Sequence, residues 1–158
     1  IGDLRGEELC PDLPALMNIP VALISTSPKD MLDRPATLDW LCQHGVHTAG
    51  EPCTGYLFCG EPVALELPLS SCNNETAVRR LTANGGLLLL NPIPEKERVQ
   101  DRSILVDAIK AGKQAEAEGR YYHPAANGEI DRRTDGYSSR IQLESIQQNY
   151  LLAKSIMD

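Results

Sequence analysis

The sequence predicts an α/β fold in which a mainly parallel sheet is flanked by helices. Two compact apolar runs, 20–25 and 87–90, have the length of strands that are buried on both faces, and stretches with helical periodicity lie between them. Strands that alternate with helices are typical of parallel sheets, because each parallel crossover needs a dozen or more residues. The 158 residues, 42% of them hydrophobic, suffice for a single domain, which we expect to span 1–158.

The first half of the chain predicts three elements after an irregular, acidic lead-in. The strand 20–25 ends close to Ser27, whose hydroxyl and following proline favour the start of a helix. We expect this helix to continue to Gly45, a residue suited to a helix C-terminus, with a kink or a division into two pieces at Pro35. A short strand is expected next, at 46–49.

The second half predicts three helices around one more buried strand. A short helix is expected at 73–84, followed by the strand 87–90 and a long helix at about 101–118. Residues 119–136 are polar and rich in turn formers, so an exposed loop is expected there. The last helix is expected at 137–157. Its apolar residues recur at helical spacing and are expected to face the core: Leu143, Ile146, Tyr150, Ala153 and Met157.

Charge and cysteine content narrow the class of function. A net charge of −7 without a basic cluster argues against nucleic-acid binding, and no apolar run is long enough to cross a membrane. The five cysteines are odd in number and form no C-x-x-C, which indicates free thiols in a reducing, cytoplasmic compartment, and no signal peptide is expected. A metal site formed by Cys42, His44, His47 and Cys53 is the alternative, although this spacing matches no standard zinc module.

Lys29 is the leading candidate for a catalytic residue. It directly follows the strand 20–25, and sites in parallel α/β sheets gather at the carboxyl ends of strands. We expect it in the first turn of the next helix, where the positive end of the helix dipole disfavours an ammonium group and so favours a nucleophilic amine. Asp30 and Asp33 would act in the opposite sense. A solvated surface lysine without a catalytic role is the alternative.

Two further segments carry groups that could bind a ligand. Residues 91–95, Asn-Pro-Ile-Pro-Glu, leave the strand 87–90 as a stiff extended chain, which could present Asn91 and backbone groups to a ligand or could simply reverse the chain. Glu8 and Asp12 belong to an acidic cluster in the lead-in. Their hard oxygen ligands suit Mg²⁺ or Mn²⁺, although acidic surface runs are commoner than metal sites.

Several segments, taken in order, resemble the pseudouridine-5′-phosphate glycosidase family, also called the indigoidine synthase A family. The resembling segments cover nearly the whole chain and are 12–16, 20–24, 29–33, 37–46, 58–59, 84–95 and 139–143. The Asn-Pro-Ile-Pro-Glu string that follows a glycine pair is a fairly specific one. Together the segments correspond to about the C-terminal half of a family member.

The resemblance implies a trimeric α/β enzyme that reversibly cleaves pseudouridine 5′-phosphate to uracil and ribose 5-phosphate with a divalent metal, typically Mn²⁺. The family's nucleophilic lysine falls on Lys29, where an iminium with the opened ribose supplies the electron sink for breaking a carbon–carbon bond. The family's metal-binding aspartate falls on Glu8, and one residue of its substrate segment is retained as Asp12. Asn91 and Arg140 are further expected substrate contacts, with Arg140 standing where the family has asparagine.

The family's N-terminal half would carry a catalytic glutamate, a second lysine and a phosphate-binding segment rich in Ser and Thr, none of which occurs in this sequence. Two hypotheses follow. In the first, the chain is a divergent C-glycosidase, or lyase, that binds a small nucleotide or sugar phosphate, assembles as a trimer and receives the other half from a companion polypeptide. In the second, it is a catalytically degenerate subunit or interaction module that keeps only the fold.

Overall fold

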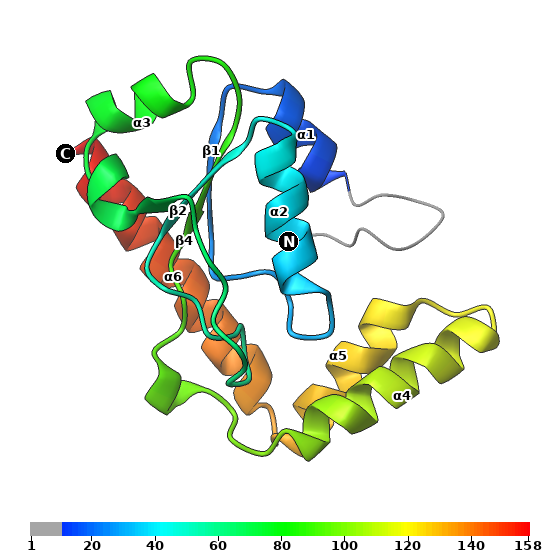
Figure 1. The fold of residues 1–158 in the computed structure, drawn as a ribbon. Coiled ribbons are helices and arrows are strands. Elements are labelled where there is room, and N and C mark those ends of the chain that lie inside the picture. Colours follow the sequence, from blue (N-terminus) through cyan, green and yellow to red (C-terminus); the bar gives the residue numbers. More distant parts are fainter. Residues whose placement is uncertain (1–10) are drawn as a thin grey trace.

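The computed structural model describes residues 11–158 as an α/β fold built on a parallel sheet (Figure 1). Glu8, like the rest of residues 1–10, lies outside the described residues. In chain order the elements are α1 (Asp12–Asn18), β1 (Ala22–Ser25), α2 (Arg34–Gln43), β2 (His47–Gly50), β3 (Leu67–Pro68), η1 (Leu69–Cys72), α3 (Glu75–Leu81), β4 (Leu87–Leu90), η2 (Glu95–Glu97), α4 (Ser103–Ala117), α5 (Tyr122–Arg133) and α6 (Tyr137–Met157).

The sheet of the described residues has the order β1-β4-β2-β3, and each pair of neighbouring strands is parallel. This confirms the predicted fold class. The carboxyl ends of the three longer strands are level, because Ser25, Leu90 and Gly50 pair with one another across the register. Ligand sites in such sheets lie beyond these ends.

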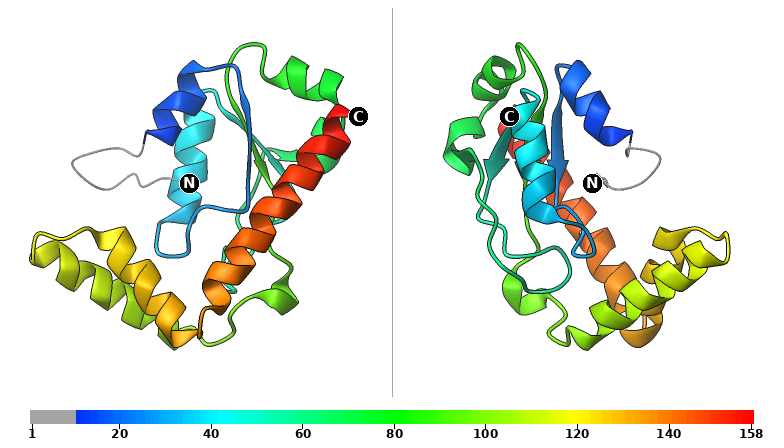
Figure 2. Two further views of the ribbon diagram at one scale, coloured as in Figure 1. Left: turned by 180° about the vertical axis from the view of Figure 1, so that it is seen from behind. Right: turned by 45° about the vertical axis from the view of Figure 1, so that its right-hand side comes forward.

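Helices cover both faces of the sheet, as parallel sheets require (Figure 2). The four leucines of β4 are buried and alternate between the two faces. Leu88 and Leu90 pack in one apolar cluster with residues of α1 and α2. Leu87 and Leu89 pack in another, which contains Ile156 of α6 and residues of α3. The expected strand 87–90 is therefore the strand through which both halves of the core are connected.

The expected helix after β1 begins later than its sequence suggests. α2 begins at Arg34, with the Asp33 side chain accepting a hydrogen bond from the backbone N–H of Ala36. Pro35 consequently lies in the first turn, where proline is tolerated, and the expected kink is absent from α2. The Ser27 hydroxyl, which was expected to cap the helix, is buried and accepts a hydrogen bond from the Cys53 thiol instead.

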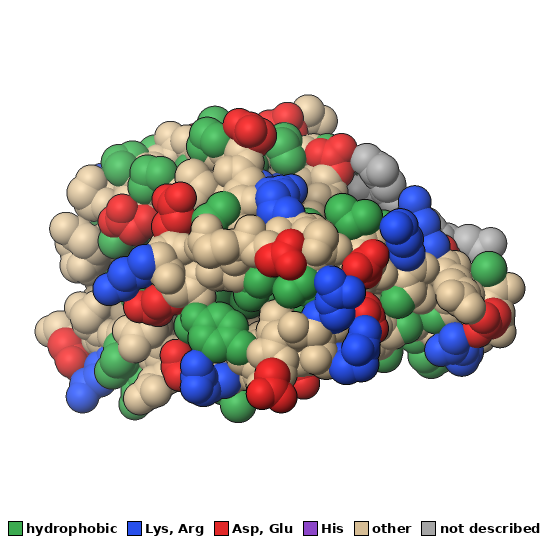
Figure 3. Space-filling view, turned by 90° about the horizontal axis from the view of Figure 1, so that it is seen from below, with side chains coloured by type: hydrophobic (Ala, Val, Ile, Leu, Met, Phe, Trp, Pro, Cys, Tyr) green, Lys and Arg blue, Asp and Glu red, His purple; other side chains and the backbone are tan. Residues whose placement is uncertain are grey.

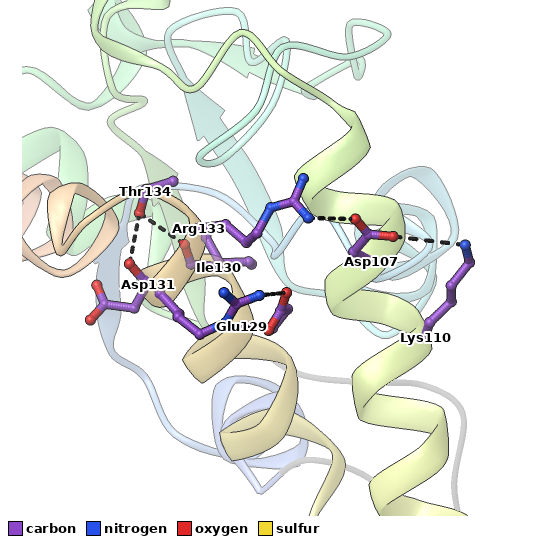
Figure 4. Close-up of polar contacts among 8 residues, drawn as sticks. Asp107, Lys110, Glu129, Ile130, Asp131, Arg133 and Thr134 are labelled. Atoms are coloured by element: carbon purple, nitrogen blue, oxygen red, sulfur yellow. Dashed lines mark hydrogen bonds and ion pairs between the residues drawn. The ribbon is translucent and has the colours of Figure 1, made fainter.

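The expected exposed loop at 119–136 is mostly helix, and this expectation was wrong. α5 packs along α4 as a helical hairpin, and Ala126 and Ile130 are its buried residues. Polar contacts also join the two helices (Figure 4): the Arg133 guanidinium lies 2.9 Å from the Asp107 carboxylate, which Lys110 approaches to 3.7 Å. A helix that buries so narrow a stripe needs few apolar residues, so its composition resembles that of a loop.

α6 is a helix over the predicted residues, but its predicted core face was wrong. Leu143, Ile146 and Tyr150 are 68%, 64% and 66% exposed. The face that packs against the rest of the protein includes Ile141 and Ile156. The apolar periodicity therefore correctly indicated a helix and indicated the wrong side of it.

The α4–α5 hairpin lies beyond the carboxyl ends of the strands. Loop residues that follow β1, β2 and β4, namely Met31, Phe58 and Ile93, belong to one apolar cluster with Leu105 of α4 and Ile130 of α5. The hairpin and the first turns of α6 thus form a wall beside the edge where Lys29 was expected to act. Within residues 11–158, no helix is both long and apolar enough to cross a membrane.

Candidate functional site

Lys29 lies at the carboxyl edge of the sheet, in the loop between β1 and α2. It is half-buried and lines two adjacent cavities, and Tyr56 and Gln142 line both of them with it. The larger is an open groove of about 600 Å³ that runs along β1 and α6. The expected place in the first helical turn was wrong, because α2 begins only at Arg34, so the helix-dipole argument does not apply to this lysine.

The Lys29 loop is held in place by its neighbour. The two carboxylate oxygens of Asp30 accept hydrogen bonds from three consecutive backbone N–H groups, those of Tyr56, Leu57 and Phe58, at 2.8, 2.7 and 2.9 Å. Hydrogen bonds to an ionised acceptor are among the stronger ones in proteins. Asp30 therefore fixes the loop that carries Lys29 against the loop that carries Tyr56.

Tyr56 supplies a neutral polar group beside Lys29. Its hydroxyl donates a hydrogen bond to Gln142 Oε1 at 3.1 Å. Burial and, secondarily, the negative charge of Asp30 raise the pKa of Tyr56 to about 12, so the phenol keeps its proton at neutral pH. Phenol and amide groups beside an amine form a set that can hydrogen-bond the hydroxyls of a sugar.

Asn91 is connected to the Lys29 groove through the interior of the protein. Its side-chain NH₂ donates to Asn149 Oδ1 at 3.0 Å, and the Asn149 NH₂ in turn lies 3.4 Å from the Thr26 hydroxyl. These three residues link the end of β4 to the end of β1 by way of α6. Asn91 itself lines a third cavity, on the other side of α6, while Asn149 lines the Lys29 groove.

The other expected site residues are not brought to Lys29. Asp12 is the first residue of α1, and its Oδ1 atom is buried without a hydrogen-bond partner among residues 11–158. Arg140 is exposed, lies 3.8 Å from the Glu144 carboxylate and stacks over the Tyr137 ring at 5.0 Å. It lines none of the three cavities described here.

The part of the chain that the structure describes does not form a metal site by itself. No three His, Cys, Asp or Glu side chains gather there in a way that could hold an ion. The alternative site of Cys42, His44, His47 and Cys53 was therefore wrong, and His47 pairs with Glu66 at 3.0 Å instead. Glu8, the expected metal ligand, lies outside the described residues.

Sequence reasoning missed the polar residues that surround Lys29. Thr26 belongs to a Ser-Thr-Ser run directly after β1, and hydroxyl groups at the end of a buried strand are a usable signal. Gln142 and Asn149 are seven residues apart, which places two amide side chains on the same face of a helix. No comparable signal indicated Tyr56, which lies in a segment without periodicity.

The charge distribution agrees with a site for a small ligand. On the face seen in Figure 3, Lys and Arg side chains are interspersed with Asp and Glu, so this face presents no basic patch to a nucleic-acid backbone. The residues lining the groove along β1 and α6 include one charged side chain, that of Lys29.

Comparison with known proteins gives a consistent family signal. The model of the family described as indigoidine synthase A like protein matches residues 6–157. A protein of Methylobacterium nodulans named pseudouridine-5′-phosphate glycosidase is 27% identical over 94% of this chain and 47% of its own length. A protein of Mesorhizobium japonicum with the same name is 28% identical over 98% of this chain and 54% of its own length.

Two solved structures share the fold. An indigoidine synthase A-like protein from Thermotoga maritima superposes with a TM-score of 0.72 at 19% identity, over 98% of this chain and 55% of that one. The prealnumycin C-glycosynthase, solved with ribulose 5-phosphate, gives 0.65 at 24% identity over 98% and 54%. The chain thus spans about half the length of the curated relatives and solved structures that it matches.

Proposed function

Since the chain belongs to the indigoidine synthase A-like family, we propose that it carries the nucleophilic lysine of an enzyme that cleaves carbon–carbon glycosidic bonds. Its relatives include proteins named pseudouridine-5′-phosphate glycosidase, and one protein that shares its fold is named a C-glycosynthase. The proposed reaction is the reversible cleavage of pseudouridine 5′-phosphate to uracil and ribose 5-phosphate. Lys29 is the proposed nucleophile.

The reaction needs an amine because the bond to be broken joins two carbon atoms. No leaving oxygen can be protonated, so the two-carboxylate route of ordinary glycosidases does not serve. In the proposed step, the neutral amine of Lys29 bonds to C1′ while the bond from C1′ to the ring oxygen breaks, and that oxygen takes up the amine proton. The carbon–carbon bond to the base then breaks as its electron pair takes up a proton on the base, and the nitrogen lone pair forms the imine at C1′. Water then hydrolyses the imine, which releases ribose 5-phosphate and restores the amine.

The observation that carries the proposal is the position of Lys29. It lies beyond the end of a buried parallel strand, half-buried, in two cavities that it shares with Tyr56 and Gln142. A lysine with no role beyond solubility would be expected to extend into bulk water. The neutral phenol and amide beside it are suited to hold sugar hydroxyls, and they leave the amine as the reactive group.

A divalent cation, expected to be Mn²⁺, belongs to the proposal as well. Its candidate carboxylates are Glu8 and Asp12. Among the described residues, the buried Oδ1 atom of Asp12 has no hydrogen-bond partner, which leaves it available to the cation. Because residues 11–158 hold no set of three such side chains, the remaining ligands would have to come from elsewhere. The contacts of Asn91 and Arg140 with the substrate stay predictions, and so does the trimeric assembly.

The proposed setting is cytoplasmic, where the four free thiols of residues 11–158 would stay reduced. No nucleic acid or membrane is expected as a partner. A catalytically degenerate subunit with the same fold is the competing function, and the exposed position of Arg140, away from the Lys29 groove, favours it. Trapping of the lysine adduct separates the two.

The experiment is borohydride trapping with ribose 5-phosphate. The amine condenses with the sugar aldehyde, water is lost, and borohydride reduces the imine to a stable secondary amine that peptide mass spectrometry can locate. It is performed with Mn²⁺ on two samples. The first is the chain alone. The second is the chain joined to the part of the Mesorhizobium japonicum relative that lies outside the match, which we call the complementing part. We expect an adduct at Lys29.

Matched variants give the result its meaning. Lys29→Ala should lose the adduct, whereas Lys110→Ala should keep it, because Lys110 is an exposed lysine on α4 far along the chain from the groove. Adducts spread evenly over exposed lysines such as Lys96, or no adduct in a folded sample that contains the complementing part, would support the degenerate subunit instead.

A further inference from the structure

The outer side of α6 carries an apolar stripe that nothing in residues 11–158 covers. In Figure 2, left, α6 lies in the foreground along the sheet with its outer side open. The residues that we call the α6 stripe recur at helical spacing over four turns and are Leu143, Ile146, Tyr150, Ala153 and Met157. Four of them are at least 57% exposed. Contiguous exposed apolar side chains mark interaction surfaces.

One side of the α6 stripe borders the groove along β1. Ile146 lines the groove along β1 together with Leu23 and Ile24 of that strand. The opposite side of α6 is mainly polar, with Leu151 as an exposed apolar residue, and Glu144 and Gln148 there line the cavity beside residues 91–94. The exposed surface of the helix is therefore mainly polar toward the end of β4, and Ile146 makes it apolar toward β1.

β1 is the edge strand of the sheet on that same side. The carbonyls of Val21 and Ser25 accept hydrogen bonds from residues of the β4 side, Leu87 and Asn91, at 2.9 Å each. Because alternate residues of a strand direct their backbone groups to opposite sides, Ala22 and Ile24 direct theirs to the open edge.

Natural proteins protect an edge strand with charges, proline or a covering element, and parallel sheets are normally buried. β1 contains no charged residue, and Val21 just before it is 41% exposed. Among residues 11–158, neither the β1 edge nor the α6 stripe is covered by another element.

From this juxtaposition we propose that the β1 edge and the α6 stripe are one docking surface for the remainder of the family fold. The occupant is a polypeptide segment that adds a strand to β1 and lays an amphipathic helix on the α6 stripe. The half-length match to the relatives supports this occupant over a second copy, because it leaves about half of the fold to be placed.

The surface is continuous with the proposed catalytic groove. Lys29, Ile146 and Ile24 line the same groove, so a segment docked here forms its missing wall and brings its own side chains within reach of the lysine. The inference rests on family membership and on the fold, not on the proposed reaction. Its test therefore reads backbone protection, and its failure would leave the Lys29 adduct experiment unaffected.

The experiment is hydrogen–deuterium exchange, resolved to single amides by NMR. It compares the chain alone with a protein in which the complementing part is joined to its N-terminus by a flexible linker, which keeps the effective concentration high. In the chain alone, the outward amides of Ala22 and Ile24 should exchange rapidly, and those of Leu23 and Ser25, directed to β4, should be protected. In the fusion protein, the two outward amides should slow by at least about tenfold.

Two variants test the helix half of the surface. Ile146→Lys places a charge in the α6 stripe and should restore rapid exchange of the outward amides in the fusion protein. Gln148→Lys adds the same charge on the polar side and should not. Because both positions are exposed, both variants should keep the circular dichroism of the parent.

Three outcomes would overturn the proposal. The outward amides could stay rapid in a fusion protein whose added part is folded. They could stay protected in the Ile146→Lys variant, which would mean that α6 takes no part. They could also be protected in the chain alone with a dimeric mass in light scattering, in which case a second copy occupies the edge.

Discussion

The carboxylate of Asp30 should be one of the most sensitive positions near the site. It accepts three backbone hydrogen bonds of 2.7 to 2.9 Å from Tyr56, Leu57 and Phe58. Each bond to a charged acceptor contributes about 1.5–3 kcal/mol. Because Asp30 is half-buried and water can replace part of the loss, we take the lower end of this range and expect Asp30→Ala to lower the free energy of unfolding by about 4 kcal/mol.

Asp30→Asn should lower the free energy of unfolding less than Asp30→Ala does. Asparagine keeps one oxygen, which can still accept from Leu57 and Phe58, but its NH₂ group would face the N–H of Tyr56. One bond is lost and two are weakened, so we expect about 2 kcal/mol. Asn74→Ala is the control, since the exposed Asn74 side chain caps α3 by accepting a hydrogen bond from the Ala77 N–H at 2.9 Å, and such caps contribute about 1 kcal/mol.

The measurement is urea unfolding at neutral pH, followed by the fluorescence of Trp40 and by circular dichroism. The expected order of destabilisation is Asp30→Ala, then Asp30→Asn, then Asn74→Ala, with similar urea dependence for all. Equal losses for Asp30→Ala and Asn74→Ala would refute the reasoning, because the three hydrogen bonds would then contribute no more than a helix cap.

Two smaller predictions concern Tyr56 and the α4–α5 hairpin. The pKa of Tyr56 is raised from 10.0 to about 12, so below pH 10 both the folded and the unfolded chain keep the phenol proton. Between pH 10 and 12 the unfolded chain loses this proton first, so the free energy of unfolding should fall as the pH rises through that window. The fall should be smaller in Tyr56→Phe. A Cβ at Gly112 would lie 2.6 Å from the Tyr122 ring, so Gly112→Ala should lower stability by about 1 kcal/mol despite better helix propensity. In a Tyr122→Ala background the same change should stabilise, and a stabilising Gly112→Ala in the parent chain would count against the close contact.

The central elements could be predicted because their signals are local. The four leucines of β4 and the apolar run of β1 are bounded by turn formers, and α4 and α6 show clear helical periodicity. The start of α2 was harder, since Ser27-Pro28 and Asp33-Arg34-Pro35 both resemble a capped helix start. Tertiary structure decides between them, because Ser27 is occupied by the thiol of Cys53, 26 residues further along the chain.

Errors arose where a pattern had two physical meanings. An apolar stripe such as that of α6 indicates a buried helix face, but the sequence does not say whether the element that covers this face lies within residues 11–158. Two of the buried positions of α6 are Ser138 and Ser145, small residues that carry no hydrophobic signal. The position of Lys29 at the carboxyl edge of the sheet could be predicted from its place after a strand, whereas the Asp30 anchor joins loops 26 to 28 residues apart and could not.

The side chains of β4 do not fix its register in the sheet, because all four are leucine. Sliding a run of four leucines by one residue exchanges leucine for leucine at most positions, so hydrophobicity alone would accept the shifted strand almost equally well. Two glycines remove this ambiguity: a Cβ at Gly86 would lie 2.2 Å from the carbonyl oxygen of Leu16, and a Cβ at Gly50 would lie 2.2 Å from that of Leu90. Bare backbone at these two points therefore acts as an alignment stop, and a larger residue at either would be expected to yield a mixture of misaligned sheets with well-buried leucines.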